Sequence, residues 1–251
     1  MLSKERMYRI LNLLKEQTFV TVKQLMDEFD VSRSSIMRDL IELENLGGAV
    51  AKDVANLTLS SFNEAPVIDK ESLHIEEKQR ICKKAAQRIK DGDCIYIDSG
   101  TTPVYLLPHI IDKQIKIVTP STYLIRKLPD SFKGDIFLLG GEFKKSYDMS
   151  YGSLTLEMIK QFNFDHAFFS TNGVNLENGE VYIFEFAIGA VKKEIMKRCL
   201  NNYLLIDSSK FNIRAICTWA NSNEFNSVYV NEFEIDIELP DNYIVCNNKE
   251  I

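Results

Sequence analysis

The stretch CIYIDSGTTP, residues 94–103, joins a short apolar run to a polar turn that contains a glycine. The apolar run is typical of a buried strand, and Gly100 permits a tight turn directly after it. Pro103 is suited to the first position of a helix, which we expect the Thr102 side chain to cap. The stretch therefore predicts a strand, a turn and a helix in succession.

The polar turn predicts an anion site, because backbone amides at a helix start and side-chain hydroxyls both bind anions. Its candidate ligand-binding residues are Asp98, Ser99, Gly100, Thr101 and Thr102. The alternative is a well-capped turn that binds nothing. The spacing matches neither a Walker loop nor a dinucleotide-binding fingerprint, which disfavours nucleotide hydrolysis.

Further short apolar runs, separated mostly by helical patterns, follow along the chain. We expect strands at residues 115–119, 136–139, 167–169, 203–206 and 228–230. Strands that alternate with helices predict an α/β fold with a mainly parallel sheet that is covered on both faces.

Polar turns also follow the other expected strands. Ligands of open α/β sheets bind beyond the carboxyl ends of the strands, so these turns are expected at one edge. The candidate ligand-binding residues there are Thr119, Ser121, Gly140, Gly141, Thr171, Asn172, Gly173 and Lys210. Amides, hydroxyls and a lysine suit a phosphorylated polyol better than an apolar ligand. A paired-carboxylate hydrolase stays open, but no nucleophile–base arrangement is legible, so we predict no catalytic residue.

Residues 1–59 carry the pattern of a winged helix-turn-helix. Apolar residues recur at helical spacing in three short segments, and residues 50–59 fit a hairpin. The third helix begins after Ser32, a good N-cap, and turns Ile36 and Leu40 inward. This pattern predicts a small DNA-binding domain.

The N-terminal half of the third helix enters the major groove in such motifs. The candidate DNA-binding residues are Ser32, Arg33, Ser34, Ser35 and Arg38, with Lys52 in the hairpin. Residues 1–52 carry eight basic and eight acidic side chains, so positive charge has to be placed locally. The alternative is a three-helix interaction module with a solvated polar face.

Composition bounds the class of protein. The chain has 251 residues and a formal net charge of −6, which argues against coating nucleic acid over its whole surface. Its five cysteines and three histidines are scattered, which predicts neither a metal site nor a cofactor. No apolar run is long enough for a membrane span and no signal-peptide pattern is present. We therefore expect a cytoplasmic protein with no membrane partner.

The sequence pattern changes between the expected DNA-binding domain and the expected α/β domain. Residues 60–72 contain Pro66 and show little periodicity, which predicts a linker. We therefore expect a DNA-binding domain at residues 1–59, the linker, and an α/β sensor domain at residues 73–251.

Together these motifs resemble the DeoR family of bacterial transcription regulators along nearly the whole chain. The third helix resembles the family's DNA-binding helix through residues 31–40 and 43–47. The second domain resembles the family at Glu77-Lys78 and at residues 98–102, 138–141, 165–168 and 207–211. Five ordered motifs at plausible spacing make this resemblance specific.

The resemblance implies a sensor domain folded like sugar-phosphate isomerases, which binds a phosphorylated sugar and relays its presence to an operator-binding head. It implies a homo-oligomeric repressor of sugar uptake or catabolism genes, acting on double-stranded operator DNA. Lys192 matches the lysine of the family's glutamate-alanine-x-x-lysine segment, and we expect it in the ligand site.

The sequence departs from the family pattern at several positions. Met37 stands where the family usually has the first of two adjacent arginines, which predicts a shifted operator preference. Residues 51–54 replace the usual histidine-glycine-glycine hairpin, which leaves wing contacts open. Pro120 replaces an asparagine, and Ile188 replaces the usual carboxylate, for which Glu185 is a candidate substitute.

Two other functions stay open at this point. A sugar-phosphate isomerase or deaminase with an appended helical domain needs a general base, and Ile188 counts against one. A DNA-binding protein that has lost ligand sensing follows if Pro120 and Ile188 have disrupted the pocket. We expect the regulator, and not an enzyme.

Overall fold

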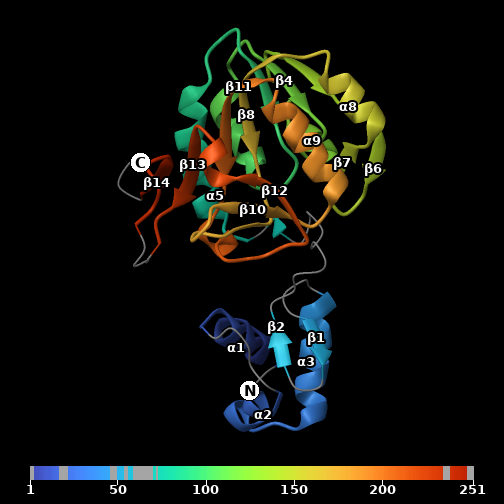
Figure 1. The fold of residues 1–251 in the computed structure, drawn as a ribbon, viewed down its shortest axis with the longest axis vertical. Coiled ribbons are helices and arrows are strands. Elements are labelled where there is room, and N and C mark those ends of the chain that lie inside the picture. The colour runs from blue at the N-terminus through green and yellow to red at the C-terminus, as the bar shows by residue number, and fades with distance from the viewer. Residues whose placement is uncertain are drawn as a thin grey trace. The chain divides into compact units, whose positions relative to one another are not determined.

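The computed structural model describes residues 3–16, 22–45, 50–53, 56–58, 70–71, 73–233 and 238–247. The chain divides into two compact units, Met1–Ala65 and Pro66–Ile251, both drawn in Figure 1. The division falls within the segment expected to be a linker. Of that segment, only Lys70 and Glu71 are among the described residues.

The smaller unit contains three helices and a hairpin, as the apolar spacing predicts. The elements are α1 (Ser3–Glu16), α2 (Val22–Phe29), α3 (Arg33–Asn45), β1 (Val50–Asp53) and β2 (Asn56–Thr58). The two strands pair antiparallel. One apolar core unites the helices, formed by the buried side chains of Met7, Ile10, Leu25, Ile36, Leu40 and Leu43.

A buried ion pair also joins α1 to α3. Arg6 donates through Nε to the carboxylate of Asp39, and both side chains are almost fully buried. Because an unpaired buried charge is costly, this pair fixes the orientation of α3 against α1. The opposite side of α3 stays available for a partner.

A seven-stranded sheet forms the centre of the larger unit, and all six of its strand pairings are parallel. Its order is β14-β13-β11-β8-β3-β4-β5. The strands are β3 (Cys94–Ile97), β4 (Lys116–Thr119), β5 (Asp135–Leu138), β8 (Phe164–Phe169), β11 (Cys199–Leu205), β13 (Ser227–Asn231) and β14 (Tyr243–Cys246). The expected α/β class is confirmed, and β14 is a strand that the apolar runs did not predict.

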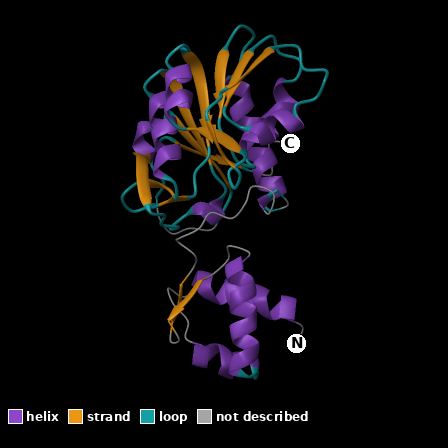
Figure 2. Ribbon diagram, turned by 90° about the vertical axis from the view of Figure 1, so that its right-hand side faces the viewer, coloured by secondary structure: helices purple, strands orange, loops and turns teal. Residues whose placement is uncertain are grey.

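Helices cover both faces of this sheet, as Figure 2 shows. They are α5 (Ile75–Ala85), α6 (Leu107–Ile110), α7 (Thr122–Lys127), α8 (Ser153–Ile159) and α9 (Phe186–Met196). Successive side chains of a strand point to opposite faces. Accordingly, Ile95 and Ile97 pack into the core that contains α5, whereas Tyr96 packs into the core that contains α9.

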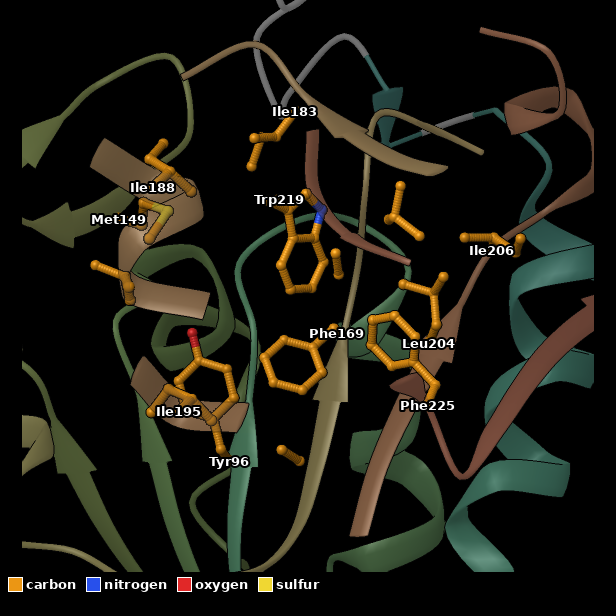
Figure 3. Packing of buried hydrophobic residues seen from close by; sticks show 14 of the residues in the cluster. Tyr96, Met149, Phe169, Ile183, Ile188, Ile195, Leu204, Ile206, Trp219 and Phe225 are labelled. Carbon is orange, nitrogen blue, oxygen red and sulfur yellow. The ribbon is translucent and has the colours of Figure 1, made fainter. Parts of the chain in front are cut away.

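Two small antiparallel sheets, absent from the sequence-based expectation, lie around the main sheet. One consists of β9 (Gly173–Val174), β10 (Glu180–Ile183) and β12 (Cys217–Asn221), and the other of β6 (Glu142–Lys144) and β7 (Met149–Tyr151). Trp219 of β12 packs beside Phe169 of β8, with 5.6 Å between the ring centroids (Figure 3). The first of these sheets therefore extends the core on the α9 side.

The turn after β3 corrects one local expectation. Thr102 precedes a short 3₁₀ helix, Pro103–Leu106, with proline at its start, but its side chain makes no capping hydrogen bond. The backbone of Thr102 is already helical, with φ −72° and ψ −52°, whereas a capping side chain usually needs an extended backbone. Proline alone therefore starts this helix. Among the described helices, none is long and apolar enough to span a bilayer.

Candidate functional site

A buried ion pair lies at the carboxyl end of β3. The ammonium of Lys192 on α9 donates to Oδ2 of Asp98, and the two residues are 2% and 0% exposed. Parallel strands end at the same edge of the sheet, so α9 brings Lys192 to the turn after β3 although 94 residues separate the pair. The structure thus brings together two residues that the sequence predicts separately.

Ser170, at the end of β8, completes the environment of Asp98. Its amide and hydroxyl donate to Oδ2 of Asp98 at 2.9 and 3.0 Å, and its carbonyl accepts from Lys192 at 3.0 Å. Tyr96 donates to the other carboxylate oxygen at 3.1 Å. The carboxylate is therefore satisfied from several sides, which makes it an orienting group more than an available base.

Sterics explain why a glycine stands at position 100 of the turn. Gly100 has φ +114°, and a Cβ atom there would lie 3.0 Å from Oγ of Ser170. Ser99, Thr101 and Thr102 are nearly buried beside it. The hydroxyl of Ser99 lies 2.9 Å from the sulfur of Met149. The turn therefore packs tightly, with its polar groups gathered in a small volume.

Trp219 connects Lys192 to the turn after β8. The Lys192 ammonium lies 5.4 Å from the centroid of the indole ring, within range of a cation–π interaction. The indole N–H donates to the hydroxyl of Thr171 at 3.1 Å. Thr171 in turn donates to the carbonyl of Tyr182 at 2.5 Å. The only tryptophan of the chain therefore lies against the candidate site.

Several lysine side chains lie close enough to Lys192 and to one another for their charges to interact. Burial lowers the pKa of Lys70 to about 7, and the charges of Lys210, Lys78 and Lys192 lower it in the same direction. Burial also lowers the pKa of Lys78 to about 8; Asp207 opposes this shift and Lys210 adds to it. A negative charge bound nearby would raise these pKa values again, because it favours the charged form of each lysine.

Asp207, at the end of β11, lies among these lysines. Its burial alone would raise its pKa, but Lys210, Ser209, His74 and Lys78 together hold the pKa below its usual value. The carboxylate is 2% exposed and accepts from the backbone amide of Ser209 at 3.1 Å. We call Lys70, Lys78, Lys192 and Lys210 the lysine cluster; the charge of Asp207 interacts favourably with those of Lys70, Lys78 and Lys210.

The remaining predicted ligand-binding residues have structural partners. Thr119 accepts from the amide of Ser121 at 3.1 Å, and Ser121 caps α7 by accepting from Leu124 at 3.1 Å. The amide of Gly140 donates to the sulfur of Met158. These interactions shape the ends of β4 and β5 and occupy the polar groups that the sequence suggested for ligand binding.

Two glycines allow close backbone approach. A Cβ atom at Gly141, where φ is +143°, would lie 2.2 Å from Oγ1 of Thr155. A Cβ atom at Gly173 would lie 1.8 Å from the carbonyl oxygen of Ile213. Next to Gly173, the side-chain oxygen of Asn172 accepts from the amide of Phe184 at 3.2 Å. The glycines are therefore packing positions of this edge.

Glu185, the candidate substitute for the carboxylate that Ile188 replaces, forms an ion pair with a lysine of another element. Ile188 is 1% exposed and belongs to the apolar core on the α9 side, as Figure 3 shows. Glu185 precedes α9 and pairs with Lys144 of β6 at 2.6 Å, with both side chains partly exposed. Glu185 therefore has its own cationic partner.

The predicted DNA-binding residues share the start of α3. Ser32, Arg33, Ser34 and Arg38 are exposed, and Ser35 is half-buried. The amide of Ser35 donates to the hydroxyl of Ser32 at 3.3 Å, which confirms Ser32 as the cap of this helix. Nε of Arg38 donates to the carbonyl of Ser34 at 3.2 Å, which directs the guanidinium along the exposed side.

Met37 and Lys52 are not part of the exposed surface at the start of α3. Met37 packs partly against the core of the smaller unit, so it does not replace the missing arginine with an exposed group. Lys52 lies on β1, but its side chain is outside the described part of the structure.

The candidate residues from the sequence do not include Lys70, Lys78 or Ser170, which the structure places around Asp98, Asp207 and Lys192. Lys78 belongs to the Glu77-Lys78 motif, so the family resemblance carried a signal for it. Lys70 falls in the expected linker and has no local signal, whereas Ser170 opens the polar turn of residues 170–173 after an expected strand, which is a weak signal. Across the described ranges, no group of three or more histidine, cysteine, aspartate or glutamate side chains could hold a metal ion.

A winged helix-turn-helix unit joined to an α/β unit with a cationic cluster defines a DNA-binding regulator with a sensor domain. A DeoR-like helix-turn-helix domain matches residues 6–52, and the DeoR C-terminal sensor domain matches residues 73–232. The chain belongs to the DeoR family of transcription regulators, which are DNA-binding proteins and not enzymes.

Named relatives agree with this assignment. The chain is 33% identical over 213 residues to the lactose phosphotransferase system repressor of Lactococcus lactis subsp. lactis, covering 83% of each chain. It is 31% identical over 228 residues to the glycerol-3-phosphate regulon repressor of Escherichia coli (strain K12), covering 88% of this chain and 87% of that one. Among solved structures, ribose 5-phosphate isomerase of Methanocaldococcus jannaschii matches 53% of each chain at 14% identity, with a TM-score of 0.39.

Proposed function

We propose that this regulator binds a phosphorylated sugar at the carboxyl edge of its parallel sheet and binds operator DNA through α3. The observation that carries the proposal is the lysine cluster next to the turn after β3, where the pKa values of Lys70 and Lys78 are lowered to about 7 and 8. Buried lysines of this kind favour an anionic ligand, because its charge offsets both their desolvation and their mutual repulsion. The names of the two repressors, which refer to lactose and to glycerol 3-phosphate, support a sugar-related effector.

Each part of the site has a proposed role. The hydroxyls of Ser99, Thr101 and Thr102 contact the phosphate or the neighbouring sugar hydroxyls, and Lys78 and Lys210 supply positive charge. Asp98 and Lys192 orient the polyol, because both are held by Ser170. The turns that carry Thr119, Ser121, Gly140 and Gly141 shape the pocket wall, as do Thr171, Asn172 and Gly173.

The DNA-binding role falls to the exposed start of α3. Serine hydroxyls and the two arginines, Arg33 and Arg38, contact phosphates and base edges in the major groove. Lys52 adds a contact from the hairpin. The resulting protein represses genes of sugar uptake or catabolism, acts as a homo-oligomer in the cytoplasm, and has its domain limits at residues 59 and 73.

Fluorescence anisotropy on DNA from upstream of the protein's own gene tests this function. The titration is repeated with a panel of pentose and hexose phosphates at one fixed salt concentration, because operator affinity depends steeply on salt. Tight binding that one phosphosugar changes is the expected result. Tight binding that no phosphosugar changes contradicts the sensor role, and binding no tighter than to random DNA contradicts the operator role.

A further inference from the structure

The larger unit begins with a main-chain contact to a buried lysine. Lys78 lies on α5, is 3% exposed, and donates from its ammonium to the backbone carbonyl of Lys70 at 2.8 Å. Lys70 and Glu71 are the first described residues after the segment that comes from the smaller unit. The buried ammonium of Lys78 therefore holds the main chain at Lys70, near the start of the sensor domain.

The same Lys78 belongs to the lysine cluster. Its charge interacts with those of Asp207 and Lys210, and the charge of Lys70 interacts with those of Lys78, Lys192 and Lys210. An ammonium has three donor hydrogens, so one of them can hold the Lys70 carbonyl while another faces an anion. Any anion in the cluster acts directly on the group that holds the entering chain.

A second contact holds the next residue from outside the cluster. Glu71 forms an ion pair with Lys127 of α7, and both side chains are partly exposed. This pair fixes the surface side of the entering chain. It is independent of Asp207 and of the turn after β3, so the two contacts can be perturbed separately.

We propose that Lys78 is a positioning residue that transmits occupancy of the anion site to the chain entering the sensor domain. A bound phosphate accepts a hydrogen bond from a second hydrogen of the Lys78 ammonium, which fixes the ammonium in place against the carbonyl of Lys70. Charge-assisted hydrogen bonds are stronger than neutral ones. The inference rests on the proposed function, since it requires an anion in this site. Because the chain from the DNA-binding unit enters here, tighter attachment at Lys70 biases the operator-binding state.

Hydrogen exchange of the wild-type protein with inorganic phosphate tests this proposal, with chloride at equal ionic strength as the blank. Calorimetry measures phosphate binding, and exchange is followed in peptides that cover residues 66–81. We expect phosphate to slow exchange there about fivefold, equivalent to about 1 kcal/mol or one hydrogen bond. Absence of phosphate binding contradicts the proposed function, whereas binding without slower exchange overturns this inference alone.

Two matched variants identify the lysine responsible. Lys78→Met and Lys210→Met each remove one charge from the cluster, and both are expected to weaken phosphate binding. At concentrations that give equal saturation, Lys210→Met retains the slower exchange at residues 66–81. Lys78→Met loses it, because Lys78 makes the contact with the carbonyl of Lys70. Slower exchange of wild-type size in Lys78→Met overturns the proposal, and the wild-type measurement still decides it if Lys78→Met does not fold.

Discussion

Asp98 and Lys192 form an ion pair in which neither residue is more than 2% exposed, at the point where β3 ends and α9 passes over it. Two buried charges are stable together because each satisfies the other and both have hydrogen bonds from or to Ser170. The pair therefore joins sheet and helix at the edge where the ligand is expected.

Breaking this pair is expected to destabilise the sensor domain strongly. Asp98→Asn leaves the ammonium of Lys192 buried without its counter-charge, at a cost of about 3–5 kcal/mol. Neutralising both residues, in Asp98→Asn with Lys192→Met, recovers part of that loss. Urea unfolding followed by Trp219 fluorescence measures the effect, since Trp219 lies in this domain's core. Asp112→Asn, which breaks an exposed pair with Lys133, is the control and costs at most about 1 kcal/mol.

Phosphosugar affinity is expected to fall as pH rises from 7 to 9. The pKa values of Lys70 and Lys78, about 7 and 8, rise when an anion binds, because the anion favours their charged forms. Binding then takes up protons above pH 7, and each proton taken up costs about a factor of ten in affinity per pH unit. The phosphate itself is already a dianion there, since its second pKa is about 6. Calorimetry in two buffers of different ionisation enthalpy counts the protons taken up on binding. An affinity that does not change between pH 7 and 9 contradicts the prediction.

Ligand binding is expected to change the emission of Trp219. The indole lies 5.4 Å from the ammonium of Lys192 and donates to Thr171, so a ligand that contacts either group alters its surroundings. Because the chain has one tryptophan, the signal has a single origin. Trp219→Phe should abolish the signal while calorimetry still detects binding. An emission spectrum that stays unchanged at saturating ligand places the ligand elsewhere.

Adding one methyl group at Gly173 is expected to destabilise the turn after β8. The new Cβ atom would lie 1.8 Å from the carbonyl oxygen of Ile213, so the backbone of β9 has to move. We expect a loss of about 2–4 kcal/mol in the free energy of unfolding for Gly173→Ala. Gly92→Ala is the control, because Gly92 has φ +94° but open space around it, and the strain alone costs about 1–2 kcal/mol. A loss near zero in Gly173→Ala would mean that the contact with Ile213 relaxes freely, because Gly173 does not have a positive φ.

Removing the guanidinium of Arg38 is expected to weaken operator binding without changing ligand binding. Arg38 is exposed on α3, and losing one base or phosphate contact costs about 1–3 kcal/mol, or about 5- to 150-fold in affinity. Anisotropy titrations at several salt concentrations measure both the affinity and the salt slope. Arg9→Ala removes an exposed arginine of α1 that pairs with Glu5, and serves as the control. An Arg38→Ala protein with wild-type operator affinity contradicts this role.

Local sequence patterns predicted much of the fold because they report what neighbouring residues do. The expected strand at residues 94–97 matches β3, and the buried residues of α3 follow the apolar spacing. The antiparallel strands β10 and β12 went unpredicted, because their pairing joins residues far apart in the chain and their local patterns are weak. The capping role expected of Thr102 was wrong, because tertiary packing gives that residue a helical backbone.

The sequence by itself determined the class of this protein: a helix-turn-helix head, an alternating α/β domain, and polar turns whose order matches one family. Those features depend on short-range periodicity and residue type, which are local. Only the tertiary structure decided which polar groups meet. It paired Asp98 with Lys192, gave both of them hydrogen bonds with Ser170, and brought Lys70 and Lys78 near Lys210 and Asp207. Burial and mutual charge gave those lysines their lowered pKa values, and both effects depend on neighbours that the fold brings from distant positions in the chain.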